Sequence, residues 1–251
     1  MMRTFTLLVL LAVAAPTLAA EGDTIFHMKV NLSDKDSLRR GARTFVNYCL
    51  SCHSAAFMRY TRMGRDLGIP DKVLKKNFIF GDHKVGDTMT VAMREKDATQ
   101  FFGGVAPPDL SVIARARGAD WLYSYLLTFY RDPSRPTGVN NLQFKGVGMP
   151  DVLWELQGWQ RPVYKEVKND LGETEKVIDH LELETPPEHK PPAYQGEDFK
   201  QTARDLVNFL VYLGEPIKLK RYAIGGRVMV YLLVLLVIVY FLKKEYWKDV
   251  H

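Results

Sequence analysis

Cys49 and Cys52 are the only two cysteines of the chain, and His53 directly follows the second of them. The resulting pattern, C-x-x-C-H, is a specific signature of covalent haem attachment. Two thiols at this spacing can add to the two vinyl groups of one porphyrin, and the histidine is then directed at the iron as proximal ligand. We therefore predict one haem c, covalently bound to Cys49 and Cys52 and ligated by His53.

Two other kinds of site also use closely spaced cysteines. A thioredoxin-like redox pair should follow a strand and open a helix, whereas this motif follows a helical pattern. A structural zinc site needs four ligands, usually with a second pair of Cys or His at short spacing. The remaining histidines stand singly, at His27, His83, His180, His189 and His251. Haem attachment is therefore the favoured function of the motif.

Two helical patterns can position the motif. Residues 33–49 place four apolar or thiol side chains on one helix face, with Ser33 as the expected N-cap: Leu38, Ala42, Phe45 and Cys49. Residues 198–214 carry a second apolar stripe and end at Gly214: Leu206, Phe209, Leu210 and Leu213. The placement of Gly41 and Phe45 before Cys49 resembles the N-terminal helix of class I cytochromes c, where a glycine lets the C-terminal helix cross closely.

Composition bounds the class of protein. The 251 residues suffice for one medium-sized domain with additional segments. Hydrophobic residues make up 47% and charged residues 25%, as in ordinary globular proteins. The formal net charge is +5, and no block of Lys and Arg is interleaved with aromatic residues. We therefore predict that the chain binds no nucleic acid.

The two ends of the chain predict export and a membrane anchor. Residues 1–20 have a basic start, an apolar run and then small residues, the layout of a secretory signal peptide. Val228 to Leu242 carries no charge, and with flanking residues it is long enough for a transmembrane helix over 221–244. Basic residues flank both ends of this helix, so the positive-inside rule does not decide its orientation. The signal peptide does, because it would export the N-terminal side. Residues 21–220 would form a periplasmic domain, and 245–251 a cytoplasmic tail.

The second axial ligand of the predicted haem iron, opposite His53, has several candidates. A methionine thioether favours the ferrous state, whereas a second histidine lowers the potential. Outside the two ends, the candidate methionines are Met28, Met58, Met63, Met89, Met93 and Met149. Met58 and Met63 lie too near His53 to cross to the opposite haem face easily, and Met89 and Met93 read as the core stripe of a helix. Met149, between glycines and a proline in a predicted loop, is favoured.

A longer stretch carries a family resemblance. The run GVAPPDLSVIARARGADWLYSYLLTFYRDPSRPTGV, from Gly104 to Val139, resembles the cytochrome c1 family, of bacterial type. The haem motif, the G-M-P loop at Met149 and the single C-terminal span match the same family, so the resemblance covers essentially the whole mature chain. It implies a mainly α fold: a class I cytochrome c-like haem domain with loop insertions and a short β-hairpin, plus one C-terminal transmembrane helix.

The resemblance also implies roles for individual residues. Met149 would be the sixth ligand, and Arg117 would pair with a haem propionate, although a surface arginine is an alternative. Pro107 and Pro108 resemble the loop near the proximal ligand, and Pro108 would belong to the haem surroundings. Trp121 stands where relatives commonly have tyrosine, so that a hydrogen bond from the indole to a propionate would replace one from a phenol.

Members of the resembled family are the membrane-anchored haem subunit of ubiquinol–cytochrome c reductase. This implies an electron-transfer subunit that is no enzyme on its own, in a dimeric complex of the cell inner membrane. It would dock on cytochrome b, accept one electron from the Rieske iron–sulfur protein and pass it to a soluble or membrane cytochrome c. A free-standing, membrane-tethered cytochrome c shuttle is the alternative. A haem peroxidase is less favoured because it usually has a second C-x-x-C-H.

An acidic segment covers residues 166–188. Its acidic residues, Glu166, Asp170, Glu173, Glu175, Asp179, Glu182, Glu184 and Glu188, outnumber Lys168 and Lys176. The pattern predicts two short strands around a turn at 169–172. Such a segment is either a solvated hairpin or a patch that steers a basic acceptor cytochrome c toward the haem.

Overall fold

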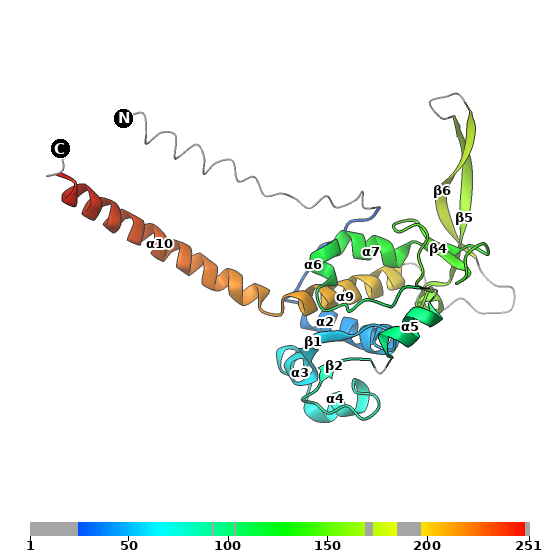
Figure 1. The fold of residues 1–251 in the computed structure, drawn as a ribbon, viewed down its shortest axis with the longest axis horizontal. Helices are drawn as coiled ribbons and strands as arrows, with labels where there is room; N and C mark the ends of the chain where they lie inside the picture. The colour runs from blue at the N-terminus through cyan, green and yellow to red at the C-terminus, as the bar shows by residue number, and fades with distance from the viewer. Residues whose placement is uncertain (1–24, 92, 103, 169–172, 185–196, 249–251) are drawn as a thin grey trace.

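The computed structural model describes residues 25–91, 93–102, 104–168, 173–184 and 197–248 (Figure 1). The predicted signal peptide therefore lies outside the described residues. The helices are α2 (Lys35–Thr44), the π-helical turn η1 (Phe45–Cys49), α3 (Tyr60–Leu67), α4 (Asp71–Asn77), α5 (Glu95–Phe101), α6 (Ile113–Arg117), α7 (Ala119–Leu127), α8 (Trp154–Gln157), α9 (Glu197–Gly214) and α10 (Lys218–Tyr246). The strands are β1 (Ala55–Arg59), β2 (Thr88–Met89), β3 (Phe129–Arg131), β4 (Val139–Asn141), β5 (Trp159–Lys168) and β6 (Thr174–Glu184). The strands pair only as three separate two-stranded antiparallel ladders among the described residues. The other elements are helices, so the predicted mainly α fold is confirmed.

Helices α2 and α9 cross at the centre of the domain (Figure 1). The predicted apolar faces of both helices are buried, as the sequence pattern required: Leu38, Ala42, Phe45 and Cys49 on one side, and Leu206, Phe209, Leu210 and Leu213 on the other. A Cβ atom added to Gly41 would lie 2.0 Å from the carbonyl oxygen of Asp205. The two backbones can approach this closely only because residue 41 has no side chain.

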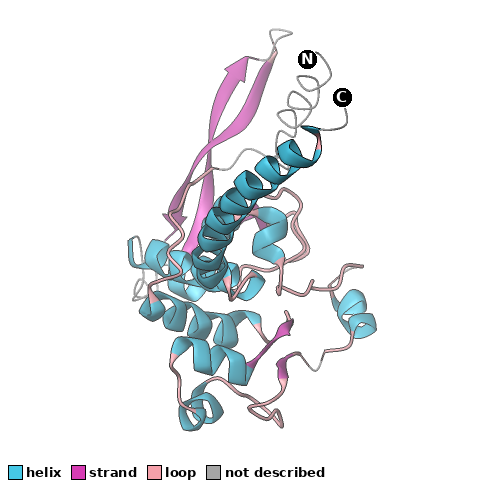
Figure 2. Ribbon diagram, turned by 90° about the vertical axis from the view of Figure 1, so that its left-hand side faces the viewer, coloured by secondary structure: helices cyan, strands magenta, loops and turns pink. Residues whose placement is uncertain are grey.

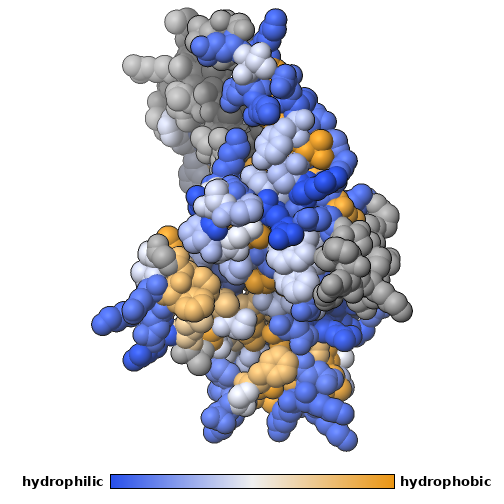
Figure 3. Space-filling view, turned by 90° about the vertical axis from the view of Figure 1, so that its right-hand side faces the viewer, coloured by the Kyte–Doolittle hydropathy of each residue, from blue (hydrophilic) through white to orange (hydrophobic). Residues whose placement is uncertain are grey.

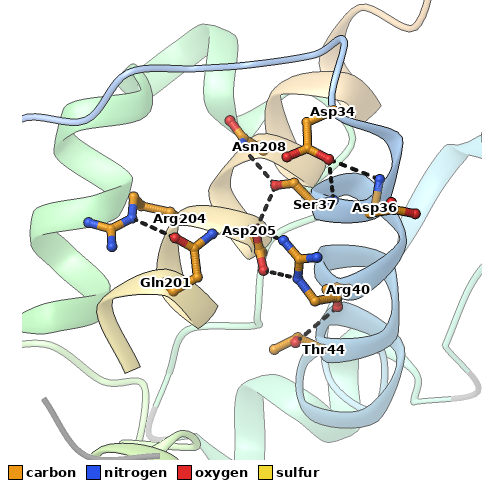
Figure 4. Close-up of polar contacts among 9 residues, drawn as sticks. All are labelled: Asp34, Asp36, Ser37, Arg40, Thr44, Gln201, Arg204, Asp205 and Asn208. Carbon is orange, nitrogen blue, oxygen red and sulfur yellow. Dashed lines mark hydrogen bonds and ion pairs between the residues drawn. The ribbon is translucent and has the colours of Figure 1, made fainter. Parts of the chain in front are cut away.

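A buried carboxylate ties the same two helices together (Figure 4). Asp205 on α9 is 2% exposed and accepts hydrogen bonds from Ser37 Oγ at 2.6 Å and Arg40 Nε at 2.6 Å. Both donors come from α2. One partner of the carboxylate is a charged guanidinium and the other a neutral hydroxyl, so the free-energy cost of burying its charge is offset. These contacts hold α2 and α9 in one register.

The start of α2 differs from the prediction by one residue. Asp34, not Ser33, is the N-cap, and its Oδ1 accepts from the backbone N–H groups of Asp36 at 3.1 Å and Ser37 at 2.9 Å (Figure 4). Both residue types cap helices well. The carboxylate adds a negative charge at the positive end of the helix, which favours Asp34.

The predicted helical stripe of Met89 and Met93 is wrong. Met89 lies on strand β2, pairs with Ala55 of β1 and is fully buried. Met93 is 38% exposed and precedes α5, which begins only at Glu95. The β-branched Thr90 and Val91, which lie between the two methionines, favour extended backbone over helix.

Strands β5 and β6 form a long hairpin that projects from the helical body (Figures 1 and 2). The predicted hairpin is confirmed, but β5 begins at Trp159, before the acidic segment, and the strands are 10 and 11 residues long. The predicted turn at 169–172 lies outside the described residues. At its base, β5 packs against β3, so one end of the hairpin is attached to the domain.

Helix α10 extends away from the helical body (Figures 1 and 2). It has 29 residues, none of them buried, and among the described residues it is the one helix that is long and apolar enough to cross a membrane. At 1.5 Å per residue it spans about 43 Å, more than the roughly 30 Å hydrocarbon core of a bilayer. Arg221 pairs with Glu215 at the junction with α9. The candidate span therefore continues almost directly from the central helix of the domain.

Candidate functional site

The C-x-x-C-H motif forms a compact turn at the end of η1. The backbone N–H groups of Cys52 and His53 both donate to the carbonyl oxygen of Cys49, at 3.0 and 2.8 Å. Cys49 is buried and Cys52 half-buried, and the two thiols are not joined in a disulfide. The turn therefore holds both sulfurs and the imidazole within one short segment, directly before strand β1.

The His53 ring is oriented by a backbone carbonyl. Its Nδ1–H donates to the carbonyl oxygen of Pro108 at 2.7 Å, which leaves Nε2 without the proton and able to bind a metal. Burial lowers the pKa of His53, so the imidazole is held in its neutral, ligating form. A second hydrogen bond that fixes the tautomer is typical of metal-ligating histidines. Of the two candidate prolines, Pro108 is thus the one that contacts His53.

The thiol environment does not suit a redox-active pair. Burial raises the pKa of Cys49 to about 12, whereas thiol–disulfide exchange needs a thiolate at working pH. The motif also follows a helix and precedes a strand, the reverse of the order expected for a thioredoxin-like site. A buried thiol that need not ionise in the folded state is compatible with a thioether linkage.

A cavity of about 410 Å³ lies beside Cys52. The loop 106–109 forms one of its walls, and the other lining residues are Ser54, Ala56, Val91, Met93, Glu95 and Ala98. The Leu110 N–H donates to the carbonyl oxygen of Ser54 at 2.8 Å, so this loop is strapped to the chain directly after the motif. A second cavity, of about 480 Å³, is lined by residues from Asp71 to Gly86 and contains none of the predicted site residues.

Large apolar side chains are exposed near the first cavity. Phe57, Phe101 and Val105 are 80%, 80% and 70% exposed, and Phe57 and Val105 are sequence neighbours of lining residues. Figure 3 shows hydrophobic residues gathered on the lower half of one face of the molecule, below a largely hydrophilic upper half. Exposed apolar side chains gathered on one face are typical of surfaces that bind a ligand or partner.

Met149 lies in a loop, and its side chain contacts both a small apolar cluster and Tyr125. Its side chain contacts a small cluster of buried residues, Phe129, Val139 and Val147. Tyr125 Oη donates a hydrogen bond to Met149 Sδ at 3.3 Å. Burial raises the pKa of Tyr125, so the hydroxyl keeps its proton and acts as the donor. Near the same loop, burial raises the pKa of Asp151 to about 7.

Arg117, Trp121 and Tyr125 form a stacked column that leads to Met149. The Arg117 guanidinium lies 5.0 Å from the centroid of the Trp121 ring. Trp121 in turn stacks on Tyr125 with centroids 5.1 Å apart and planes inclined by 10°. Trp121 and Tyr125 are one helical turn apart on α7, which makes them neighbours on its surface. Arg117, Trp121 and Met149 were predicted from the sequence, whereas Tyr125, which joins them, was not.

The candidate residues therefore form two groups. One contains the motif and Pro108, and the other is the column that ends at Met149. Tyr125 packs against the main core, which includes Cys49, and also against the cluster beside Met149. The chemistry of the donors fits a haem: two thiols for its vinyl groups, one neutral imidazole, one thioether, and an exposed guanidinium for a carboxylate.

A helical domain with C-x-x-C-H at the end of a buried helix, and an exposed apolar helix after it, defines the class of membrane-anchored c-type cytochromes. The sequence model of the Cytochrome C1 family matches residues 25–158 and 194–250. The chain therefore belongs to the cytochrome c1 family. Members of this family bind one covalently attached haem c, and haem c is accordingly the cofactor of this chain.

Individual relatives agree with this assignment. The chain is 44% identical over 243 residues to cytochrome c1 of Allochromatium vinosum, which covers 96% of both chains. It is 44% identical over 253 residues to a Nitrosomonas europaea protein named ammonia monooxygenase gamma subunit, which covers 100% of both. Identity to cytochrome c1 of Rhodospirillum rubrum is 26% over 242 residues, or 86% of this chain and 83% of that one. The family match leaves out 159–193, which contains the whole β5–β6 hairpin.

Proposed function

We propose that the chain carries single electrons as the haem subunit of a ubiquinol–cytochrome c reductase, with haem c bound to Cys49 and Cys52. The observation that supports this most is the motif turn, in which His53 donates from Nδ1 to Pro108 and keeps Nε2 for iron. The haem supplies a one-electron couple, and the protein supplies its position and electronic environment.

Each proposed site residue has a distinct task. His53 is the proximal ligand, and the Pro108 carbonyl holds its ring in one orientation. Met149 is the sixth ligand, a soft thioether that favours the reduced iron and raises the potential. Arg117 binds a haem propionate, because its planar fork can make two hydrogen bonds to one carboxylate. Trp121 holds this guanidinium by ring contact, which supports a role in positioning Arg117.

The proposed arrangement in the cell follows from the two ends of the chain. Residues 1–20 are a signal peptide, 21–220 a periplasmic haem domain, 221–244 a transmembrane helix and 245–251 a cytoplasmic tail. The exposed apolar surface of α10 supports the membrane span and a contact with cytochrome b. In a dimeric complex of the inner membrane, the haem domain would accept electrons from a Rieske protein and pass them to a cytochrome c.

The direct junction between α9 and α10 favours a complex subunit over a free-standing shuttle. Gly214 ends α9 and Lys218 begins α10, and the ion pair between Arg221 and Glu215 braces the connection. A shuttle would need a longer flexible linker to reach distant partners. One relative is named as a subunit of ammonia monooxygenase. The family match and the other named relatives favour the quinol-oxidising complex.

The proposed function predicts that this chain co-purifies with cytochrome b and a Rieske protein from detergent-solubilised membranes. Added ubiquinol should reduce its haem, and removal of the Rieske protein should stop that reduction. Visible spectroscopy of the c-type haem during the reaction measures this. A chain that purifies without either partner, or whose haem stays oxidised with quinol, would exclude the assignment.

The structure changes the basis of the acidic-patch hypothesis. Three of the acidic residues pair with basic residues outside the counted segment: Lys165–Asp179 at 2.8 Å, Arg161–Glu182 at 3.0 Å and Arg131–Glu184 at 3.1 Å. These pairs reduce the negative field along the hairpin, from Glu184 at its base to Asp179 farther along β6. The steering role therefore stays a prediction, and it now rests on the exposed Glu166 and Glu175 near the tip.

If the tip steers a basic acceptor, replacing Glu166 and Glu175 with glutamine should lower the bimolecular oxidation rate at low salt by about twofold to fivefold. The difference should disappear at high salt because exposed charges are screened. Stopped-flow oxidation by a basic cytochrome c measures both effects. The matched control replaces Glu182 and Glu184 with glutamine. It changes the net charge by the same amount, but at the base of the hairpin, where both carboxylates pair with arginines. It should lower the rate less than the change at the tip. Equal rates for both variants and the unmodified chain would reject the patch.

A further inference from the structure

Tyr125 contacts the sulfur atom of the proposed sixth ligand. Its hydroxyl lies 3.3 Å from Met149 Sδ and is oriented as a hydrogen-bond donor. A thioether sulfur has two lone pairs and accepts hydrogen bonds weakly. One lone pair can therefore bind iron while the other accepts from the phenol, so the contact is compatible with ligation.

The hydroxyl is held in place by rigid packing. Trp121 stacks on one side of the Tyr125 ring, and Phe129 meets it edge to face with centroids 5.0 Å apart and planes at 72°. Tyr125 comes from helix α7 and Met149 from a loop 24 residues later. The contact thus anchors a loop residue to a helix, which restricts where the sulfur atom can lie.

We propose that Tyr125 is a positioning residue that fixes the Met149 sulfur and makes the haem easier to reduce. The inference rests on the proposed ligation of iron by Met149. A hydrogen bond to the sulfur withdraws electron density from it, and a weaker donor stabilises ferric iron less than ferrous iron. The phenol therefore adds to the effect of the thioether on the potential.

Tyr125→Phe removes the hydroxyl and keeps the ring that stacks on Trp121. At a fixed ambient potential, the ratio of oxidised to reduced haem should rise about threefold, the scale expected for one modest hydrogen bond. The thioether-to-iron charge-transfer band of the oxidised protein should shift or broaden because the sulfur is less restricted. Redox titration of the solubilised complex and its absorption spectrum measure the two effects.

Tyr123→Phe is the matched control. Tyr123 is also on α7 and is 4% exposed, but its hydroxyl accepts from Arg204 Nη1 at 3.3 Å instead of contacting Met149. This variant loses the same atom from the same helix. It should keep the redox equilibrium and the spectrum of the unmodified protein.

Met149→Leu separates the inference from the proposed function. This variant should lose the charge-transfer band, and its reduced form should bind carbon monoxide at the vacated position. If Met149→Leu behaves so while Tyr125→Phe is indistinguishable from Tyr123→Phe, ligation stands and the role of Tyr125 is wrong. If Met149→Leu retains the band, Met149 is not the ligand and the inference fails together with that assignment.

Discussion

An alanine at position 41 is expected to prevent the haem domain from reaching its folded state in normal amounts. The added Cβ would lie 2.0 Å from the Asp205 carbonyl oxygen and 2.8 Å from Phe209 Cβ. The closest obstacle is backbone, so no side-chain rotation relieves the clash, and α2 and α9 must separate. Overpacking of this kind costs about 3 kcal/mol or more, a large share of the stability of a domain.

The amount of haem-bearing protein in membranes and the thermal unfolding midpoint of the solubilised protein measure this effect. Gly225→Ala is the control, because a Cβ at position 225 on α10 would meet no atom within 4 Å apart from the backbone of its own helix. Alanine also has a higher helix propensity than glycine. The control should be neutral or slightly stabilising. Normal yield and midpoint for Gly41→Ala would show that the two helices do not cross as closely as described.

Replacing both Cys49 and Cys52 with alanine should eliminate covalent haem completely. Each thiol supplies one thioether bond, so either single variant should keep one bond and hold less haem through denaturation. Alanine at position 49 also leaves space in the core, since Cys49 is buried, and that variant should be less stable than Cys52→Ala.

Haem-dependent staining after denaturing electrophoresis tests this directly. Met149→Leu serves as the control: the sixth ligand forms no bond to the porphyrin, so this variant should stain fully. A double variant that stains like the unmodified chain would mean that haem is attached elsewhere or is retained without covalent bonds.

The sequence predicted those parts of the fold that depend on periodic patterns. The helices over 35–49 and 197–214 repeat apolar residues every three or four positions, and both faces are buried. The close crossing at Gly41 was predicted from the resemblance to the N-terminal helix of class I cytochromes c, and the lack of space for a Cβ there confirms it. The charge-free apolar run from Val228 to Leu242 predicted the exposed apolar helix α10 by its length and composition.

Local competition explains the errors at the ends of elements. Ser33 and Asp34 are both good caps, and the choice depends on backbone geometry that the sequence does not specify. Met89 and Met93 have the spacing of a helix, yet the pairing of β2 with β1 places Met89 in a strand. Tertiary pairing overrode the local pattern there.

Contacts between distant residues were the least predictable. The bond from Tyr125 to Met149 joins a helix to an irregular loop, and no periodic signal links them. Likewise, the ion pair between Arg131 and Glu184 connects β3 to the hairpin, so a charge count within 166–188 misses it. The contacts of the Trp121 ring with Arg117 and Tyr125 were likewise not predicted, and the hydrogen bond from its indole to a propionate stays a prediction.

The central claim, that a porphyrin is covalently joined to Cys49 and Cys52, is tested most directly by acid–acetone extraction of the purified, denatured chain. We expect the colour to remain with the polypeptide. Mass spectrometry should then place one haem on the peptide that contains Cys49, Cys52 and His53. Complete transfer of the pigment into the acetone, with an unmodified peptide mass, would contradict the account.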